Sequence, residues 1–598
     1  MATRKRSKPG TFDLFAGGEP GAATALAEAP PAIETATAEA AQTARDAVPT
    51  AVPAGGRGKG NGAQGSGGSA ERRASGSATR RASGSAEEQA KKQREISISE
   101  FFTKNRHLLG FDNPSKALLT TIKEAVDNSL DACEEAGILP AIRVEAHQVA
   151  EERFRVVVED NGPGIVRAQI PRIFGKLLYG SKFHTLKQSR GQQGIGISAA
   201  GMYGQLTTGK PVRITSRTAP KADAHRFEVK INTQKNEPII TVDEVVDWDP
   251  PHGTRVEIEL EAVHKRGRRS VDDYLALTAV ANPHLELSYR EPGGEEIHYP
   301  RVTDALPHEA QAIKPHPYGV ELGILMSMLE QTKSRTLHAF LQDEFSRVGA
   351  KVADEICERA LLRPQAKPAS LGRDQVEQLL HGIAGTKIMA PPTNCLSPIG
   401  AAELEAGLRK VVQAEFFTAV SRKPAVYRGN PFLVEAALAW GVAGMPADEL
   451  ALLHRFANRV PLQYQQGACA ITKSVVAAGW KNYGLSQSKG ALPAGALVVT
   501  VHIASAWVPF TSESKEAVAG YPEILREIRL ALQDCGRRLG GHIRRGKRLA
   551  EARQKSDYIK SYIPHIGEAL REILGLSETR ERQIVERLSE TLERSRKV

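Results

Sequence analysis

Two glycine-rich segments have the composition of backbone that approaches a ligand closely. Residues 191–198, GQQGIGIS, lead into a predicted helix, and the free N–H groups and dipole of a helix N-terminus can hold phosphate. Residues 160–164, DNGPG, end a predicted strand with an acid and two glycines, a residue type that permits close backbone approach. DNG alone is an ordinary turn signal, so this motif gains weight only beside the others.

Two familiar phosphate-binding motifs are excluded. GIGISA at 194–199 satisfies G-x-G-x-x-A, but the dinucleotide fingerprint follows directly on a strand and has an acid about 20 residues later. Here a polar loop precedes the glycines, and the residues near 216 are SRT. No G-x-x-x-x-G-K-[ST] is present, which excludes a P-loop.

The helix predicted at 115–136 carries acids on one side. At about 100° per residue, Glu124, Asp127, Asn128 and Asp131 fall within one arc of roughly 100°. The opposite face is a normal core stripe, formed by Leu119, Ile122, Val126, Leu130 and Cys133. Neighbouring acids repel one another and weaken an exposed helix, so this face needs a reason other than helix stability.

The elements around these motifs predict an α+β sandwich. Strands are expected at 153–160, 212–217, 225–231 and 254–262, with a second helix opening at the glycine-rich loop. Such alternation indicates helices on one face of a mixed sheet.

Composition sets the broad class. The 598 residues carry a net charge of +11, which is compatible with nucleic acid as a partner. The five cysteines are scattered without a C-x-x-C pair, which favours a reducing, cytoplasmic setting over disulfides or zinc. No apolar segment long enough for a membrane span is seen, and the start of the chain lacks the apolar segment of a secretion signal.

The two ends of the chain differ from its middle. Residues 1–95, rich in Ala, Gly, Pro, Ser and Thr, are expected to form a disordered tail, either a solubilising tether or a weak nucleic-acid-binding arm. Residues 536–548 are strongly basic, a pattern that an ordinary solvated helical face also produces. A narrow apolar stripe, Ile584, Leu588 and Leu592, follows; such a stripe is often half of an interface.

Taken in chain order, the motifs resemble those of the GHKL ATPases. They are an E-x-x-x-N helix, D-x-G-x-G after a strand, a glycine-rich loop opening a helix, and HGT at 252–254 before a strand. The resemblance implies ATP and Mg²⁺ as cofactors, Glu124 as the catalytic general base, Asn128 as the Mg²⁺ ligand and Asp160 as the acceptor for the adenine amino group. Further nucleotide-binding residues implied are Gly162, Gly164, Ser181, Lys182, Gly191, Gln192, Gln193, Gly194, Ile195, Gly196, Ile197 and Ser198.

A closer resemblance covers about 97 to 550. EFFTKNRHLLGFDNPSKAL, LLYGSKFH, RGQQGIGISAAGMYGQLTTGKP, MAPPTNCLSPIG and GWKNYGLSQ are similar to segments of the B-subunit family of type IIB DNA topoisomerase VI. The family implies a GHKL ATPase domain with an N-terminal strap (96–310), a helix-two-turns-helix insert (311–390), a ribosomal-S5-like transducer (391–550) and a C-terminal helical segment that docks a partner (551–598). The apolar spacing of the insert predicts helices. A DNA-binding role and a role in packing both fit such a helical domain. Lys481 in WKNYG matches the family's nucleotide-sensing lysine, a catalytic and nucleotide-binding role.

Two classes of function follow from this resemblance. The first is the ATP-hydrolysing component of a type IIB DNA topoisomerase, associated with the nucleoid. It dimerises on ATP binding, joins the topoisomerase VI A-subunit (a separate chain with a catalytic tyrosine and a Toprim domain) in an A2B2 heterotetramer, and acts on double-stranded DNA. The second is a GHKL dimerisation clamp that serves another DNA or protein machine without strand passage.

Overall fold

The computed structural model describes residues 90, 93, 95–182, 185–191, 194–512 and 514–594. The tail expected at 1–95 lies almost entirely outside these residues, so its disorder stays a prediction. None of the helices within the described ranges combines the length and apolar character that crossing a membrane requires.

The helix with the acidic side is α3, Pro114–Glu135. Its N-cap Asn113 accepts a hydrogen bond from the backbone N–H of Lys116, and proline follows at the first helical position, both of which favour helix initiation. The five residues of the expected apolar stripe are all buried. The predicted helix is therefore confirmed to within one residue at each end.

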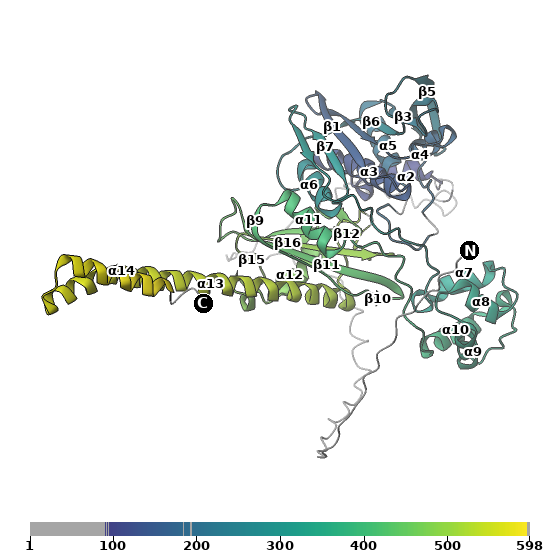
Figure 1. Ribbon diagram of the computed structural model, residues 1–598. Helices are drawn as coiled ribbons and strands as arrows, with labels where there is room; N and C mark the ends of the chain where they lie inside the picture. Colours follow the sequence, from purple (N-terminus) through teal and green to yellow (C-terminus); the bar gives the residue numbers. More distant parts are fainter. Residues whose placement is uncertain are drawn as a thin grey trace, which may run out of the picture. The chain divides into compact units, whose positions relative to one another are not determined.

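An eight-stranded mixed sheet carries the glycine motifs (Figure 1). Its strands are β1 Ala141–Ala150, β2 Arg153–Asp160, β3 Val212–Arg217, β4 Ala224–Asn232, β5 Glu237–Val246, β6 Gly253–Glu261, β7 Glu286–Arg290 and β8 Glu296–Tyr299. Their order is β5-β4-β3-β6-β2-β1-β7-β8, and only β1 and β7 pair in parallel.

Helices cover this sheet through one shared hydrophobic core. Besides α3 these are α4 Ile170–Gly175, α5 Gly196–Thr208 and α6 Val271–Ala281, with η2 Arg167–Gln169 before α4. Ahead of α3 come α2 Ile98–Lys104 and η1 Arg106–Leu109. The expected α+β sandwich is confirmed.

Residues 317–385, all of them described, contain helices and no strand. They are η3 Pro317–Gly319, α7 Leu322–Gln331, α8 Leu337–Glu344, α9 Ala350–Arg359, η4 Pro368–Ser370 and α10 Arg373–Gly385. A separate core, which includes Leu325, Phe340, Ile356 and Leu379, holds them together. The helical character of the insert is thus confirmed.

A second mixed sheet follows, with the order β10-β11-β16-β12-β13 and β9 also paired to β11. Its elements are α11 Ala401–Val411, β9 Ala414–Ser421, β10 Ala425–Tyr427, β11 Asn430–Val442, β12 Leu452–Ala457, β13 Val460–Pro461, η5 Gln466–Ala468, α12 Ala470–Ala477, η6 Trp480–Tyr483 and β16 Leu497–Ser505. A small pair, β14 Ser486–Gln487 and β15 Pro493–Ala494, lies between η6 and β16.

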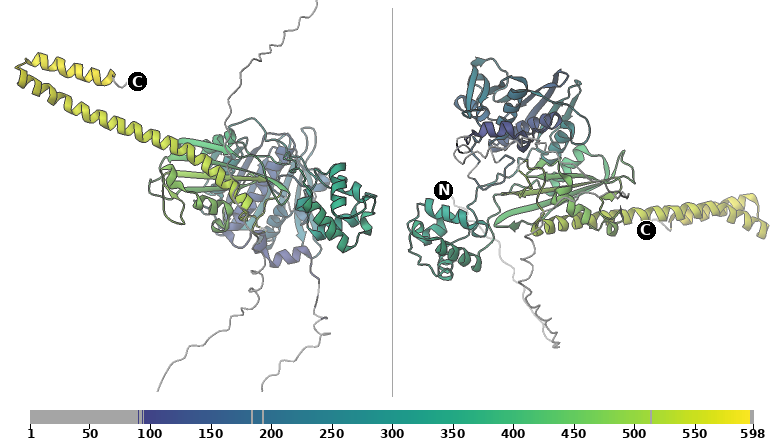
Figure 2. Two further views of the ribbon diagram at one scale, coloured as in Figure 1. Left: turned by 90° about the horizontal axis from the view of Figure 1, so that it is seen from below. Right: turned by 180° about the vertical axis from the view of Figure 1, so that it is seen from behind.

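The last long helix, α13, runs from Pro522 to Leu574 (Figure 2). Its first half packs on the second sheet through residues such as Ile528, Leu532 and Leu539. The boundary expected at 550 falls inside this continuous helix. After Gly575, which has a left-handed φ of 62°, α14 Glu578–Arg594 folds back, and Val585 lies against Gly567 of α13.

Candidate functional site

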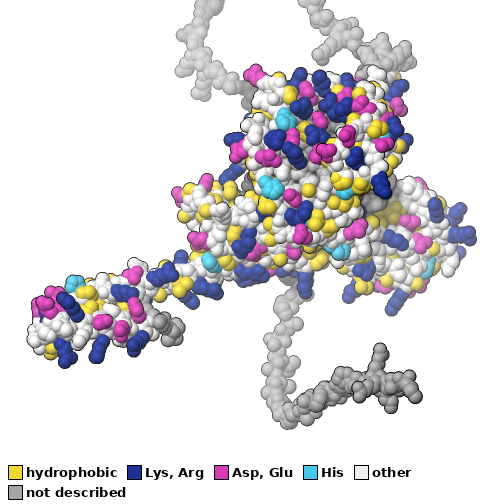
Figure 3. All heavy atoms as spheres, turned by 45° about the horizontal axis from the view of Figure 1, so that its top comes forward, with side chains coloured by type: hydrophobic (Ala, Val, Ile, Leu, Met, Phe, Trp, Pro, Cys, Tyr) yellow, Lys and Arg dark blue, Asp and Glu magenta, His cyan; other side chains and the backbone are white. Residues whose placement is uncertain are grey.

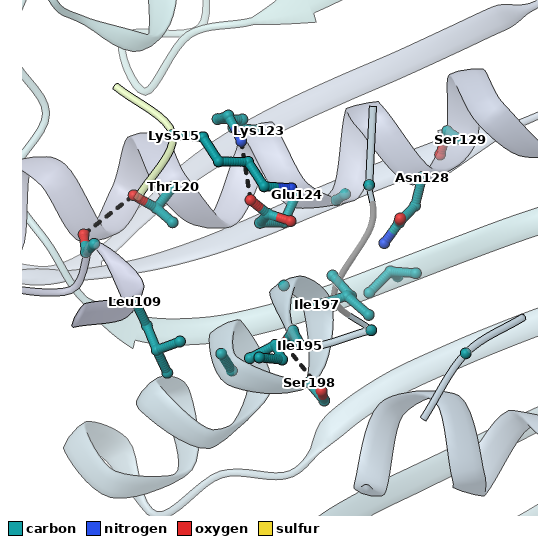
Figure 4. Close-up of a pocket in the computed structure, with 18 of the residues that line it drawn as sticks. Leu109, Thr120, Lys123, Glu124, Asn128, Ser129, Ile195, Ile197, Ser198 and Lys515 are labelled. Carbon is teal, nitrogen blue, oxygen red and sulfur yellow. Dashed lines mark hydrogen bonds and ion pairs between the residues drawn. The ribbon is translucent and has the colours of Figure 1, made fainter. Parts of the chain in front are cut away.

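A cavity of about 670 Å³ lies where the polar side of α3 faces the glycine-rich segments (Figure 4). Residues of two domains line it, the domain of the eight-stranded sheet and the domain of the second sheet. From the first domain come Glu124, Asn128, Asp160, Gly164, Ser181, Lys182, Gly191, Gly194, Ile195, Gly196, Ile197 and Ser198, and from the second Pro461–Tyr464 and Ser514–Glu516. Of the predicted nucleotide-binding residues, Gln192 and Gln193 lie outside the described residues.

Glu124 points from α3 to the first turn of α5 (Figure 4). A Cβ added at Gly196 would lie 1.7 Å from Oε2 of Glu124, so only glycine admits the carboxylate at this helix N-terminus. Burial alone would raise the pKa of Glu124, but Lys123, 3.0 Å away, and Lys515 outweigh it and hold that pKa below its ordinary value. The group is therefore an ionised carboxylate at neutral pH.

Asn128 lies one helical turn further along α3 and extends its exposed amide into the same cavity (Figure 4). Its Oδ1 is 4.0 Å from the Cβ position of Gly191, where the glycine-rich loop begins. Glu124 and Asn128 thus face that loop together, as the E-x-x-x-N spacing predicts.

Asp160 sits at the other end of the cavity, buried at the C-terminal end of β2. Its Oδ1 accepts hydrogen bonds from the N–H groups of Gly162 (2.9 Å) and Thr254 (3.2 Å), and its Oδ2 accepts one from Ser129 Oγ (2.7 Å). Burial raises the pKa of Asp160, and these three hydrogen bonds partly offset the effect.

Sheet register explains why DNGPG and HGT act together. β2 and β6 are neighbours in which Asp160 pairs with Thr254, and a ring nitrogen of His252 lies 2.8 Å from the carbonyl oxygen of Gly162. Gly164 has a φ of 71°, and a Cβ there would lie 2.0 Å from the carbonyl oxygen of Arg217. The glycine is required at this turn by both its backbone conformation and its surroundings.

Lys182 lines the cavity, but its ammonium is engaged elsewhere. Nζ lies 2.6 Å from Asp131 and 3.1 Å from Glu135. Burial would lower the pKa of Lys182, but these two carboxylates raise it. Ser181 also lines the cavity.

The structure does not bring Lys481 to this cavity. Lys481 is exposed on η6, which is anchored by the buried Trp480, whose Nε1 donates to the carbonyl of Val475, and by Tyr483, whose ring packs on Gly536 of α13. The loop is therefore packed against α13 in its own domain and does not line the cavity, so the nucleotide contact expected of Lys481 stays a prediction.

A different lysine of the second domain lies in the cavity. Lys515 reaches the vicinity of Lys123 and Glu124 (Figure 4). Its backbone has a left-handed φ of 54°. The pKa of Lys515 lies below its ordinary value, because burial and the nearby Lys123 lower it by more than Glu124 raises it.

The next residue, Glu516, holds this turn against α3. Its carboxylate lies 2.6 Å from Nζ of Lys116, which also pairs with Asp112 at 3.0 Å and lies over the ring of Tyr464. Both side chains of the Lys116–Glu516 pair are only 10–13% exposed. This ion pair fixes Lys515 at the wall of the cavity.

The remaining acids of α3 are structural. Asp127 lies 3.5 Å from Lys123, four residues earlier, and accepts a hydrogen bond from the hydroxyl of Tyr274; burial raises its pKa to about 6. Asp131 pairs with Arg190 (2.8 Å) as well as with Lys182. The expected repulsion along the helix is thus relieved by cations from outside it and by Lys123 within it.

The segment before α3 contacts the first domain. Ser97, the N-cap of α2, donates from Oγ to the carbonyl of Thr233, and Ser99 Oγ within α2 donates to Asn236. Phe101, Phe102 and Leu108 line the same cavity, and Phe101 is 41% exposed.

Sequence reasoning missed Lys515, Glu516, Ser129, Thr254 and Arg190. A lone lysine or glutamate in a polar turn is normally a solvated residue, so nothing in SESKE singled out Lys515. Thr254 had a signal, because it belongs to HGT and only the strand pairing was missing.

These features define an ATPase of the GHKL class. Residues 113–264 match the family model described as "Histidine kinase-, DNA gyrase B-, and HSP90-like ATPase", and residues 391–555 match "Topoisomerase VI B subunit, transducer". The chain is 51% identical over 486 residues to the B-subunit of type 2 DNA topoisomerase 6 from Methanococcoides burtonii, covering 81% of this chain and 78% of that protein. It is 50% identical over 484 residues to the protein of that name from Archaeoglobus fulgidus, covering 81% and 80%.

The chain belongs to the B-subunit family of type 2 DNA topoisomerase 6. Among solved structures, the B-subunit of the DNA gyrase from Myxococcus xanthus aligns with 14% identity and a TM-score of 0.37, covering 73% of this chain and 94% of that one. That similarity is too low to support an inference about this chain.

Proposed function

We propose that this chain is the ATP-binding and ATP-hydrolysing component of a type IIB DNA topoisomerase. The observation that carries the proposal is the shared cavity, in which Glu124 meets the N-terminus of α5 while Lys515 enters from the transducer. A cavity built by two domains gives ATP a means of joining them.

The residues of the cavity suit each part of ATP. Asp160 offers Oδ2 to the adenine amino group beside Ser129, and the N-terminus of α5 with its glycines suits phosphates. Glu124, ionised and held at that terminus, orients the attacking water and accepts its proton. Asn128 would supply one oxygen ligand to Mg²⁺, which would offset the negative charge of the phosphates.

Lys515 takes the sensing role expected for Lys481. An ammonium in contact with the terminal phosphate makes a charge-assisted contact with ATP that ADP lacks. A ligand shifts an equilibrium only through such differential binding, so ATP favours the state in which the transducer contacts the ATPase domain. The Lys116–Glu516 pair holds the turn that makes this contact.

The partners of this chain follow from the B-subunit family and from the exposed side chains of α13. A separate chain, the DNA-cleaving A-subunit, makes the double-strand break, and the described end of this chain, α13 with α14, is where it docks. Exposed cations lie along α13 (Figure 3), among them Arg544, Arg545, Lys547 and Arg548. Their charge suits contact with the phosphates of duplex DNA. Two copies dimerise on ATP through the strap, residues 96–111, and with two A-subunits they form an A2B2 heterotetramer.

The test is relaxation of a supercoiled plasmid by this chain together with its DNA-cleaving partner. The wild type should relax it only with ATP, and Glu124→Gln should lower hydrolysis by about 10²–10⁴-fold while a non-hydrolysable ATP analogue still produces a dimer in light scattering. Glu151→Gln, the same change in the exposed turn between β1 and β2, is the control. ATP-driven dimerisation without any change in plasmid topology would instead favour a clamp that serves another machine.

A further inference from the structure

The chain entering the glycine-rich loop is fixed by the transducer. Gln188 is buried, and its side chain makes two hydrogen bonds with the backbone of Ser397: Nε2 donates to the carbonyl (2.8 Å) and Oε1 accepts from the N–H (2.7 Å). The N–H of Gln188 donates to the carbonyl of Cys395. Asn458 Nδ2 donates to the carbonyl of the next residue, Ser189. These contacts join positions more than 200 residues apart in sequence.

A buried ionic cluster continues the same junction. Arg190 donates to Asp131, to both oxygens of Glu134 and to Asn282, and Arg459 of the transducer lies 3.6 Å from Glu134. The side chains of Arg190 and Arg459 are each 4% exposed. Burial would raise the pKa of Glu134, but Arg190, His284 and Arg459 hold it far below its ordinary value.

The chain leaving the loop is fixed by the ATPase domain itself. Gln205 in α5 makes the same kind of paired contact as Gln188, but with Ile231 of β4: Nε2 donates to the carbonyl (3.0 Å) and Oε1 accepts from the N–H (2.7 Å). Close packing of α5 on β6 adds to this, because a Cβ at Gly204 would lie 2.7 Å from the carbonyl oxygen of Glu259.

The two ends of the loop are therefore attached differently. The entry contacts the transducer through Gln188 and Ser189 and the ATPase domain through Arg190, whereas the exit contacts the ATPase domain alone. Five residues, 191–195, separate Arg190 from the first residue of α5. A chain this short spans less than about 20 Å even when fully extended, which limits the relative movement of its two ends. A displacement of the transducer against the ATPase domain pulls on the contacts of Gln188 and Ser189, two and one residues before Arg190, and so on the entry to the loop.

We propose that Gln188 is a positioning residue through which the transducer sets the geometry of the phosphate-binding loop. The inference rests on the proposed function and adds to it a second link between the domains, independent of Lys515. Through this link the nucleotide and the transducer influence each other reciprocally, as two coupled binding equilibria must.

The experiment compares ATP and ADP affinities of the full chain by displacement of a fluorescent ATP analogue. Gln188→Met removes both hydrogen bonds and keeps the volume, and Gln205→Met removes the equivalent pair inside one domain. We expect Gln188→Met to lower the ATP-over-ADP preference by about fivefold or more, and Gln205→Met to leave that preference unchanged even if its melting temperature falls. An equal change in both variants, or none in Gln188→Met, overturns the inference.

A measurement on the wild type does not depend on the folding of any variant. Hydrogen exchange of the N–H groups of Ser397 and Gln188 should differ between the ADP state and the state with a non-hydrolysable ATP analogue, whereas the N–H of Ile231 should not. Identical exchange of Ser397 and Gln188 in the two states overturns the inference. If the wild type binds no ATP at all, the proposed function itself fails, which is a distinguishable result.

Discussion

Replacing Asp160 by asparagine separates nucleotide recognition from folding. In Asp160→Asn, Oδ1 keeps the hydrogen bonds from Gly162 and Thr254, and the hydroxyl of Ser129 turns to accept from the new amide at the position of Oδ2. The turn therefore keeps its partners. What disappears is the free acceptor at Oδ2, because an amide N–H now faces the adenine amino group.

The magnitude follows from the type of contact. A hydrogen bond to a charged group contributes about 1.5–3 kcal/mol, and about 1.4 kcal/mol corresponds to a tenfold change in affinity. ATP affinity should therefore fall about 10- to 150-fold in Asp160→Asn. Guanine carries a carbonyl oxygen where adenine carries its amino group, so GTP should lose less affinity than ATP or gain some.

The assay is displacement of a bound fluorescent nucleotide by ATP and by GTP, with melting temperatures measured alongside. Asp243→Asn is the control, because Asp243 on β5 pairs with Arg167 and lies outside the cavity. An Asp160→Asn variant that melts like the wild type and binds ATP with wild-type affinity would refute the placement of adenine at this end.

Three further predictions concern the walls of the cavity and its junction. Gly196→Ala should abolish ATP hydrolysis in an enzyme-coupled assay, because its Cβ would occupy the position of the Glu124 carboxylate; retained activity would show that Glu124 acts from elsewhere. Glu516→Gln should lower hydrolysis by about tenfold or more through loss of the charged contact to Lys116, whereas the exposed Glu523→Gln on α13 should not. Glu134→Gln should cost about 3–5 kcal/mol of stability at pH 7. In the wild type, the stabilisation that comes from the lowered pKa of Glu134 is complete above the ordinary glutamate pKa of 4.5 and is lost as pH falls. The difference in denaturant midpoint between the wild type and this variant should therefore narrow below pH 4.5.

Local pattern was enough for the elements that carry their own signal. The 3.6-residue spacing of the apolar stripe placed α3, and alternation placed β2, β3, β4 and β6. β5 was missed, because its two faces are both largely exposed and it lacks an apolar–polar alternation. A strand held mainly by its neighbour in the sheet has no pattern of its own to read.

Contacts between distant segments were not readable from one sequence. The two candidate lysines, Lys481 and Lys515, both stand in polar loops flanked by aromatic or apolar residues, and only the fold shows that one loop packs on α13 and the other on α3. The partners of Asp131 and Glu134 come from Arg190 and Arg459, whose burial no periodicity predicts. Motif order located the cavity, and tertiary packing decided which residues complete it.

The most direct test is the ATP-over-ADP affinity ratio of the full chain, measured for the wild type, Lys515→Ala and Lys481→Ala. If ATP joins the transducer to the ATPase domain through Lys515, the ratio should fall about tenfold or more in Lys515→Ala, the value of a lost charge-assisted contact. It should stay at the wild-type value in Lys481→Ala, whose side chain is exposed outside the cavity. A wild-type ratio in Lys515→Ala, or a fall of the ratio confined to Lys481→Ala, would contradict this assignment.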